Sequence, residues 1–304
     1  MNIERIAGNL GFPEGPVAMD DGSVLFVEIR NQCLSRIDRN GVKSIVAELG
    51  GGPNGAAIGP DGAVYVANNG GFTWTPLESG ELLPHGIPDD YVGGSIQRVD
   101  LNTGKSVTLY TECEGVKLKG PNDLVFDQYG GFYFTDFGKA TDEWRHFGDL
   151  YYARADGSLI AKVRAQLWQP NGVGLSPDGK TVYVAEAYTS RLWGFDIIGP
   201  GVLVPPPADM TPGRHIWSAP GYRLLDSLAV EAGGNVCIAT VVDGGVSVVS
   251  PAGDYEHVPV PAFLITNICF GGEDMRTTWI TAGLPGQLFK ARWPREGLRL
   301  NYNA

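Results

Sequence analysis

The sequence has few of the residues that build the commonest catalytic and metal sites. It contains four histidines and four cysteines in 304 residues, and neither type has the spacing of a zinc ligand set. No Cys-x-x-Cys pair occurs, so we expect reduced thiols at Cys33, Cys113, Cys237 and Cys269. The Gly-x-Ser-x-Gly pattern of a hydrolase nucleophile is also missing. These absences argue against a histidine- or cysteine-based zinc site and against a serine nucleophile.

Long apolar runs and positive charge are scarce as well. No stretch is long enough to span a bilayer, and the first residues lack the apolar core of a signal peptide. We therefore expect a cytoplasmic protein with no membrane partner. The formal net charge is −11 at pH 7, which argues against nucleic acid as a partner. The sequence gives no indication of an oligomeric state.

Glycine and proline are abundant instead. The chain has 43 glycines and 21 prolines, and 43% of its residues are hydrophobic. Many turns combined with ample core material are typical of an all-β globular protein. No helix of any length is evident from the pattern.

A polar residue opens a repeated unit six times, and an apolar strand begins ten or eleven residues after it each time. The polar residues are Glu14, Asn54, Asn122, Asn171, Asp226 and Asn267. The strands that follow begin at Val24, Val64, Phe132, Val182, Val236 and Thr278. Turns rich in aspartate and glycine, such as 20–22 and 177–179, separate the two positions and suit tight hairpins.

Three to four antiparallel strands in each of six units predict a six-bladed β-propeller of four-stranded blades, as a single domain over residues 1–304. A β-sandwich is the alternative, but it does not explain why the same polar position recurs in every unit. Three stretches exceed the length of the repeat, and we expect them to be insertions that wall a pocket or decorate the surface. They lie around residues 70–93, 138–147 and 199–217.

The recurring polar residues predict a cation site. The first strands of all blades line the central channel of a propeller in the same direction, so their starts meet at one mouth. Glu14 and Asp226 supply carboxylates there, and Asn122 and Asn171 supply amide oxygens. Such oxygen ligands suit Ca²⁺ or Mg²⁺, and a cation removes the repulsion between the two carboxylates. We interpret Asn54 and Asn267 as capping or lining residues.

Five short motifs together resemble those of the SMP-30/gluconolactonase (regucalcin-like) family of six-bladed propellers. They are Phe12-Pro13-Glu14-Gly15-Pro16, Gly120-Pro121-Asn122-Asp123-Leu124, Phe134-Thr135-Asp136-Phe137-Gly138, Pro170-Asn171-Gly172 and Leu225-Asp226-Ser227. The resemblance covers nearly the whole chain. It implies a lactone hydrolase with one divalent cation at the mouth. Ca²⁺ is the favoured cation, and Mg²⁺, Mn²⁺ and Zn²⁺ are alternatives.

The resemblance also implies roles for individual residues. Glu14, Asn171 and Asp226 are expected to ligate the metal, and Asn122 to ligate it or bind substrate beside it. Asp226 matches the acid–base residue of the family.

The substrate is expected to be a small lactone or ester. Its expected contacts are Asn122, Asn54, Asp136 and two aromatic residues of the insertions, Trp74 and Trp144. The animal members carry a basic residue two positions before the asparagine at Asn122, where this chain has Gly120. That departure and the aromatic loops point to a less polar substrate. A phosphotriesterase using the same site and a non-catalytic calcium-binding propeller are the alternative functions.

Overall fold

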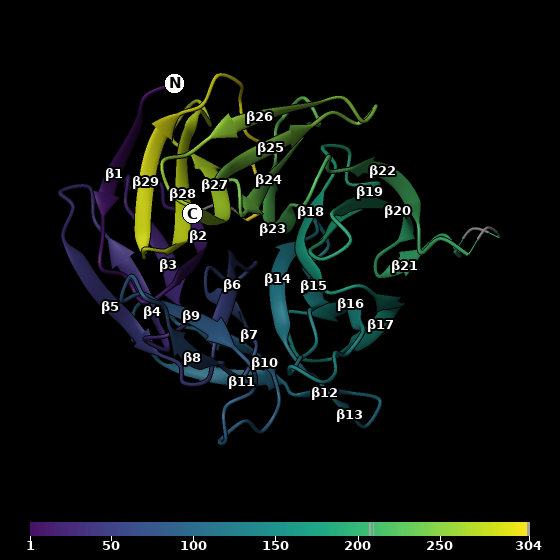
Figure 1. Cartoon of the computed structure of the whole chain (residues 1–304). Helices are drawn as coiled ribbons and strands as arrows, with labels where there is room; N and C mark the ends of the chain where they lie inside the picture. The colour runs from purple at the N-terminus through teal and green to yellow at the C-terminus, as the bar shows by residue number, and fades with distance from the viewer. Residues whose placement is uncertain (207, 209, 303–304) are drawn as a thin grey trace.

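The protein is built of β-strands alone in the computed structural model, which describes residues 1–206, 208 and 210–302. No helix occurs among these residues, and hence none that could cross a membrane. The strands form antiparallel sheets that stand side by side in a ring around a central axis (Figure 1). This arrangement is a β-propeller and confirms the predicted all-β fold.

The first three sheets along the ring contain four strands each. The first sheet consists of β2 (Pro13–Ala18), β3 (Val24–Glu28), β4 (Cys33–Ile37) and β5 (Lys43–Glu48). The second consists of β6 (Pro53–Ile58), β7 (Val64–Asn68), β10 (Ser95–Val99) and β11 (Ser106–Tyr110). The third consists of β14 (Pro121–Phe126), β15 (Gly131–Asp136), β16 (Gly148–Arg154) and β17 (Ile160–Leu167).

The next sheet has five strands, and both ends of the chain take part in the last one. The five are β18 (Pro170–Leu175), β19 (Thr181–Glu186), β20 (Arg191–Gly199), β21 (Val202–Leu203) and β22 (Arg214–Ser218). An eight-stranded sheet follows, made of β23 (Leu224–Val230), β24 (Val236–Val241), β25 (Gly245–Val249), β26 (Tyr255–Pro259), β27 (Leu264–Gly271), β28 (Thr277–Leu284), β29 (Gln287–Arg292) and β1 (Ile3–Ala7). β1 pairs with β29, so the N-terminal strand completes the ring.

The innermost strands touch one another all the way around the axis. β2, β6, β14, β18, β23 and β27 each contact the next, and β27 returns to contact β2. In every one of them the pairing with its neighbour shifts register at the polar motif. The polar residues therefore lie within these strands, at β-bulges near their starts. A bulge turns side chains away from regular alternation.

The second strand of each unit begins within one residue of its predicted start. These strands are buried along nearly their whole length, as in β3, β7 and β19. β-branched and aromatic side chains suit that environment, since they pack well on a pleated surface. The turn before β3 has Gly22 at φ 83°, which a glycine adopts without strain.

The expected insertions take defined structures. The stretch 70–93 contains the hairpin of β8 (Thr73–Pro76) and β9 (Leu82–His85), and the stretch 138–147 contains a bridge between Ala140 and Arg145. The stretch 199–217 includes residues 207 and 209, which lie outside the described residues. Its end belongs to β22, which pairs with β20. A small hairpin of β12 (Glu112–Cys113) and β13 (Val116–Lys117) lies outside the sheets of the ring.

Residues Gly174–Thr181 match the Gly-x-x-x-x-Gly-Lys-Thr pattern of a phosphate-binding loop. In the structure they form the hairpin between β18 and β19, closed by a hydrogen bond from the Ser176 amide to the Thr181 carbonyl (2.9 Å). A phosphate-binding loop requires a strand followed by a helix. The match is therefore a hairpin turn and no nucleotide site.

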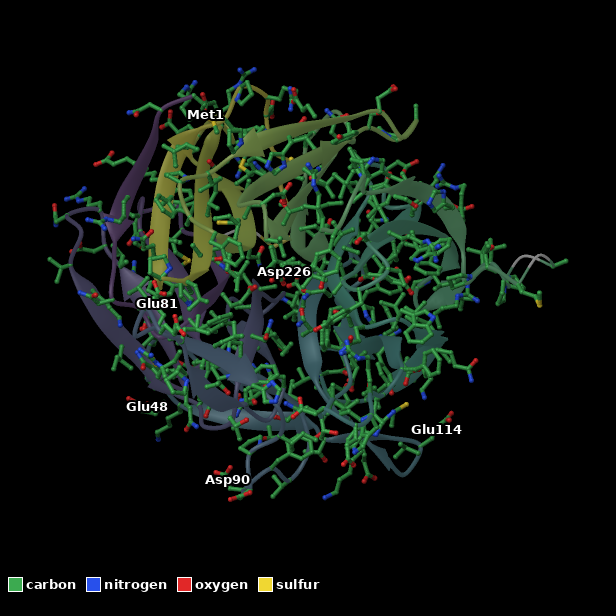
Figure 2. All side chains as sticks on the ribbon, in the orientation of Figure 1. Met1, Glu48, Glu81, Asp90, Glu114 and Asp226 are labelled. Atoms are coloured by element: carbon green, nitrogen blue, oxygen red, sulfur yellow. The ribbon has the colours of Figure 1, made fainter. Side chains whose placement is uncertain are left out.

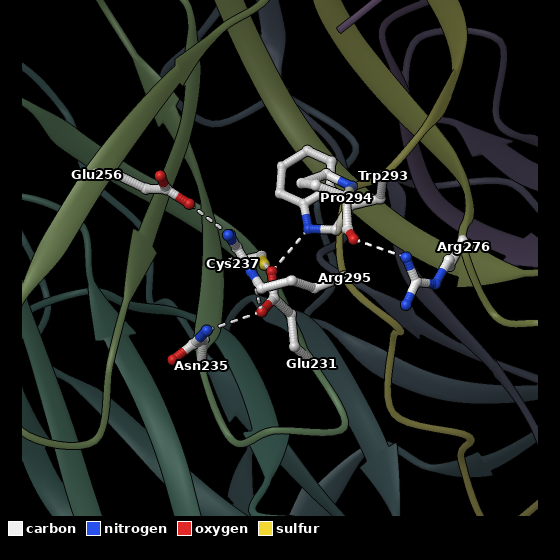
Figure 3. A network of polar contacts seen from close by, with 8 residues as sticks. All are labelled: Glu231, Asn235, Cys237, Glu256, Arg276, Trp293, Pro294 and Arg295. Carbon is white, nitrogen blue, oxygen red and sulfur yellow. Dashed lines mark hydrogen bonds and ion pairs between the residues drawn. The ribbon is translucent and has the colours of Figure 1, made fainter.

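The C-terminal segment crosses the end of the channel opposite the polar mouth. Leu298, Leu300 and Tyr302 close a cavity of about 100 Å³ that the inner strands line mostly with apolar side chains. The segment is anchored by Glu231, whose buried carboxylate accepts hydrogen bonds from Trp293 Nε1 (2.6 Å) and Arg295 Nε (2.6 Å), as Figure 3 shows. This anchor holds the closing segment against the ring.

We expect Glu231→Gln to lower the free energy of unfolding by about 2 kcal/mol, because charge-assisted hydrogen bonds from Trp293 and Arg295 are lost. The matched control is Glu256→Gln, which removes the exposed partner of Arg295. That change should cost less than about 0.5 kcal/mol. Urea denaturation measures both variants, and equal costs would contradict the role of Glu231 as the anchor.

Candidate functional site

The mouth of the channel collects polar side chains that are largely withdrawn from water. Glu14, Asn54, Asn122, Asn171 and Asn267 are buried, and Asp226 is partly exposed. In Figure 2 Asp226 lies near the centre of the ring, while the labelled Glu48, Asp90 and Glu114 lie at its edge. The register breaks in the inner strands place these side chains at one end of the channel.

Glu14 is held from two sides. Its Oε2 accepts hydrogen bonds from the Gly15 amide (2.6 Å) and from Asn267 Nδ2 (2.9 Å). Gly15 has φ 51°, a value that favours glycine, and a Cβ there would lie 2.7 Å from the Ala56 amide nitrogen. Glycine therefore permits the inner strands to approach closely at this point. Asn267 thus orients Glu14.

Asp226 and Asn171 form a second group on neighbouring strands. The Asn171 side chain and the Ser227 amide hydrogen-bond the Asp226 carboxylate. Ser227 Oγ donates to Asn171 Oδ1 (3.3 Å). An amide oxygen has two lone pairs, so this bond leaves Asn171 able to bind a cation as well.

A third carboxylate, Asp123, lies in the same group and was not among the predicted site residues. It is buried, accepts hydrogen bonds from the Leu124 and Val173 amides, lies next to the Ser227 side chain, and lines the channel cavity. Its charge acts on both Glu14 and Asp226. The motif Asn122-Asp123 contained the only signal, a carboxylate directly after a predicted site residue.

Burial raises the pKa of all three carboxyl groups. The pKa of Asp226 rises to about 8 and that of Asp123 to about 7, in both cases chiefly through desolvation. The pKa of Glu14 is raised well above its ordinary value by burial and then by the charges of Asp226 and Asp123. Perturbed carboxyl groups that face one another are typical of functional sites.

One buried oxygen atom at the mouth has no hydrogen-bond donor. Asn122 Oδ1 is buried and no donor in the described structure bonds it. A buried carbonyl oxygen without a partner costs about 1–3 kcal/mol. A hard cation would satisfy this oxygen and offset the repulsion among the carboxylates. The donor set therefore fits a cation, although no cluster of three or more His, Cys, Asp or Glu placed for metal binding occurs among the residues described.

Asn54 is tied to the first insertion. Asn69 Nδ2 donates to Asn54 Oδ1 (3.0 Å), and Asn69 Oδ1 accepts from the Gly71 amide (2.8 Å). The side chain of Asn54 thus links the mouth to the base of the loop 70–93.

Asp136 lies outside this group of carboxylates. Its buried side chain accepts hydrogen bonds from the Lys119, Gly120 and Gly138 amides, at 2.7, 2.7 and 2.8 Å. Burial raises the pKa of Asp136, and the amide donors oppose the rise. These contacts fix the start of β14 and the start of the segment 138–147. A role of Asp136 in substrate binding stays a prediction.

The two aromatic residues predicted to contact substrate lie on the insertions. Trp74 packs edge-on against Phe12, and their ring centroids are 5.6 Å apart. Phe12 lies two residues before Glu14 in the chain. Trp144 packs on His146 at 4.6 Å and is 45% exposed. Both rings are thus placed by neighbours, and their role toward a substrate stays a prediction.

A buried lysine joins the two insertions. Lys139 Nζ donates to the Gly71 carbonyl (2.5 Å) and lies 4.3 Å from the ring centroid of Phe72 and 5.1 Å from that of Tyr91. Burial lowers the pKa of Lys139 to about 7. A second contact, His85 Nε2 to Asp142 Oδ1 (3.2 Å), joins the same loops. The insertions therefore form one continuous wall beside the mouth.

Comparison with known proteins identifies the class of protein that carries this site. The sequence profile of the SMP-30/Gluconolactonase/LRE-like region matches residues 12–283. The chain therefore belongs to the SMP-30/gluconolactonase family, as its motifs predicted.

Particular relatives support this membership. The chain is 24% identical over 305 residues to the gluconolactonase of Zymomonas mobilis, a match that covers 92% of this chain and 78% of the relative. It is 34% identical over 132 residues to the lactonase drp35 of Staphylococcus saprophyticus, covering 43% of this chain and 39% of that protein. The structure of regucalcin from Agrobacterium tumefaciens, a calcium-binding protein, matches with a TM-score of 0.76 and 18% identity, over 98% of this chain and 96% of that one. The last similarity shows the fold.

The raised carboxyl pKa values predict how the metal-free protein responds to pH. Asp226 has a pKa of about 8 and Asp123 of about 7 when folded, against about 3.9 when unfolded. Between these values the folded state holds protons that the unfolded state has released. In chelator, the free energy of unfolding should therefore fall as pH rises from about 4 to about 8.

Urea denaturation at a series of pH values measures this slope. Asp226→Asn should flatten it, and Ca²⁺ should restore stability at pH 8 by binding the folded state. A slope unaffected by either change would contradict the coupling of these groups.

The buried Lys139 gives an opposite pH dependence. Its pKa is lowered to about 7 when folded, against about 10.4 when unfolded. Between these pH values Lys139 therefore binds more protons in the unfolded state than in the folded state. The titration of Lys139 thus makes the free energy of unfolding rise with pH. Lys139→Met should remove this contribution, so its stability relative to the native chain should be greatest near pH 6.5 and decline by a few kcal/mol, on the order of 2–4, toward pH 10. Denaturation at both pH values measures it, and a constant difference would refute the buried charge.

Proposed function

We propose that the protein is a lactonase that binds one divalent cation at the channel mouth and hydrolyses the ester bond of a small lactone. The unpartnered Asn122 Oδ1 among the carboxylates of Glu14, Asp123 and Asp226, the first two of them buried, carries the proposal, because such a site is costly unless a cation occupies it. The gluconolactonase and lactonase relatives support the choice of reaction.

Glu14, Asn122, Asn171 and Asp226 would hold the cation through oxygen atoms. Ca²⁺ suits these hard ligands best, and the calcium-binding regucalcin of similar fold supports it. When bound, the cation supplies Lewis-acid stabilisation of the oxyanion that develops on the lactone carbonyl. The positive charge also lowers the carboxyl pKa values that burial raises, which makes Asp226 a carboxylate at neutral pH.

Asp226 is proposed as the acid–base residue. Its carboxylate takes a proton from the attacking water, whose oxygen bonds to the carbonyl carbon. The ring C–O bond then breaks, and Asp226 returns the proton to the leaving alkoxide oxygen. The product is the hydroxy acid, and the carboxylate is regenerated. The hydrogen bonds from Asn171 and the Ser227 amide keep the carboxylate in place.

Substrate contacts are proposed from the residues around this centre. Asn122 and Asn54 lie at the mouth, Trp74 stands beside Phe12, and Trp144 lies on the second insertion. Asp136 supports the backbone between them.

We further propose that residues 1–304 form one domain with six blades of four strands. In this reading the eight-stranded sheet comprises two blades joined through the Val241–Leu264 pair. All four cysteines are free thiols, which supports a reduced, cytoplasmic compartment.

Asp226→Asn should lower kcat for lactone hydrolysis by about 10²–10⁴-fold, the usual contribution of a general acid–base group. Hydrolysis of glucono-δ-lactone and of unsubstituted δ-valerolactone, followed by acid release, measures it. Asp156→Asn is the matched control, since this carboxylate lies in an exposed turn, where it accepts hydrogen bonds from Ser158. Chelation should abolish activity and Ca²⁺ should restore it. Full activity of Asp226→Asn, or hydrolysis of a phosphotriester in place of every lactone, would overturn the proposal.

A further inference from the structure

Exposed aromatic side chains gather on one part of the rim of the mouth. Phe147, Trp168 and Tyr188, here called the rim cluster, are 45%, 49% and 46% exposed. They come from three separate segments, before β16, before β18 and after β19. Phe147 and Trp168 are in ring contact, and Arg145 joins Tyr188 to Gln169, the residue after Trp168, so the three belong to one group and are not scattered apolar residues.

The rings of the rim cluster are held in defined positions. Phe147 and Trp168 meet edge to face with centroids 4.6 Å apart. The guanidinium of Arg145 lies 4.0 Å from the ring centroid of Tyr188, and its Nη1 donates to Gln169 Oε1. Arg145 thus joins the segment 138–147 to Tyr188 and to Gln169, the residue after Trp168.

The backbone beneath the rim cluster is equally fixed. The Trp168 amide donates to the buried carboxylate of Glu186 (2.8 Å), and the Ala187 amide donates to the Gln169 carbonyl (3.1 Å). The rings therefore project from a rigid support, and a ligand that binds them pays little ordering entropy.

The segments that carry the rim cluster adjoin the start of β18, which carries the proposed cation ligand Asn171. Pro170 pairs with Glu186 across β18 and β19, and Asn171 is the next residue. A Cβ on Gly148 would lie 2.3 Å from Pro170 Cδ, so the chain after Phe147 touches the start of β18. A molecule whose ester group reaches Asn171 is therefore next to the chain segments that carry Phe147 and Trp168.

The chemistry of the rim cluster favours an apolar group on the ligand. Its surface consists of aromatic faces and edges, which gain free energy from apolar area removed from water. An alkyl or aryl group would gain from the same contact.

We propose that Phe147, Trp168 and Tyr188 form a specificity subsite that binds an apolar substituent on the lactone ring. The inference rests on the proposed lactonase function and deepens it, since it names lactones with an alkyl or aryl substituent as the substrate class. The rim cluster acts on binding and takes no part in the bond-breaking step.

A pair of substrates that share one ring tests the subsite. δ-Decalactone carries a five-carbon tail, and δ-valerolactone has the same ring without it. With the Ca²⁺-loaded protein, kcat/KM should be more than about 10-fold higher for δ-decalactone, because each buried CH₂ favours binding. Trp168→Ala should lower this ratio by about 5–10-fold through KM, and Trp168→Phe should retain most of it.

Two variants control for a merely structural effect. Phe147→Ala should act in the same direction as Trp168→Ala, and both should lower kcat/KM much less for δ-valerolactone than for δ-decalactone, since the tail is the part that contacts the cluster. Tyr129→Ala removes an aromatic ring that is 62% exposed in the turn between β14 and β15, at the opposite end of the channel. It should change neither substrate.

The outcomes separate this inference from the function beneath it. Hydrolysis of both lactones with no preference for the tail, or an equal loss on both substrates in Trp168→Ala, overturns the subsite and leaves the lactonase standing. Hydrolysis of no lactone at all overturns both.

Discussion

The crowding of the inner strands around a single axis is the constraint on which the rest of this molecule depends. A Cβ on Gly55 would lie 2.5 Å from the Asn122 carbonyl, and one on Gly172 would lie 2.7 Å from the Leu228 amide nitrogen. Because the backbones are this close, there is no room for side chains between the strands. The side chains at the strand ends therefore point into the shared opening. Glu14 and Asn267 are therefore hydrogen-bonded although 253 residues separate them.

The same crowding brings carboxylates together, which is the electrostatic cost that the proposed cation would offset. Glu14, Asp123 and Asp226 are drawn out of water and toward one another, so each raises the cost of charging its neighbours. A core designed for stability alone would have apolar residues in these places. Here the cost is concentrated at one mouth, while the rest of the channel is mostly apolar. Local frustration confined to one end of a regular fold is where function is expected.

Much of the fold could be predicted because two patterns recur along the sequence: the alternation of residues within strands, and the polar residue that opens each unit. Alternation and turn residues place the strands, as the starts of β3 and β24 at their predicted residues show. The polar position adds the common mouth. Asp123 could not be recognised in this way, because consecutive residues of a regular strand point to opposite faces. Only the bulge between Pro121 and Leu124 allows both Asn122 and Asp123 to serve the channel.

Contacts between distant loops were beyond the sequence for a different reason. A lysine in a loop is normally solvated, so nothing in the pattern around Lys139 predicts its burial beneath Phe72 and Tyr91. The rim cluster likewise assembles from three segments whose spacing follows no period. Such features depend on how insertions fold over the repeat, which is specified by packing and not by strand alternation.

The pairing of β1 with β29 has a consequence for how this chain acquires its chemistry. The mouth draws Glu14 from the first sheet and Asp226 from the last, and these meet only after the two ends of the chain have joined. Long-range closure of this kind is slow and comes late in folding. A cation bound to both Glu14 and Asp226 would then stabilise the closed ring. A chain whose ring is incomplete or open would contain the same residues but would not bind the cation.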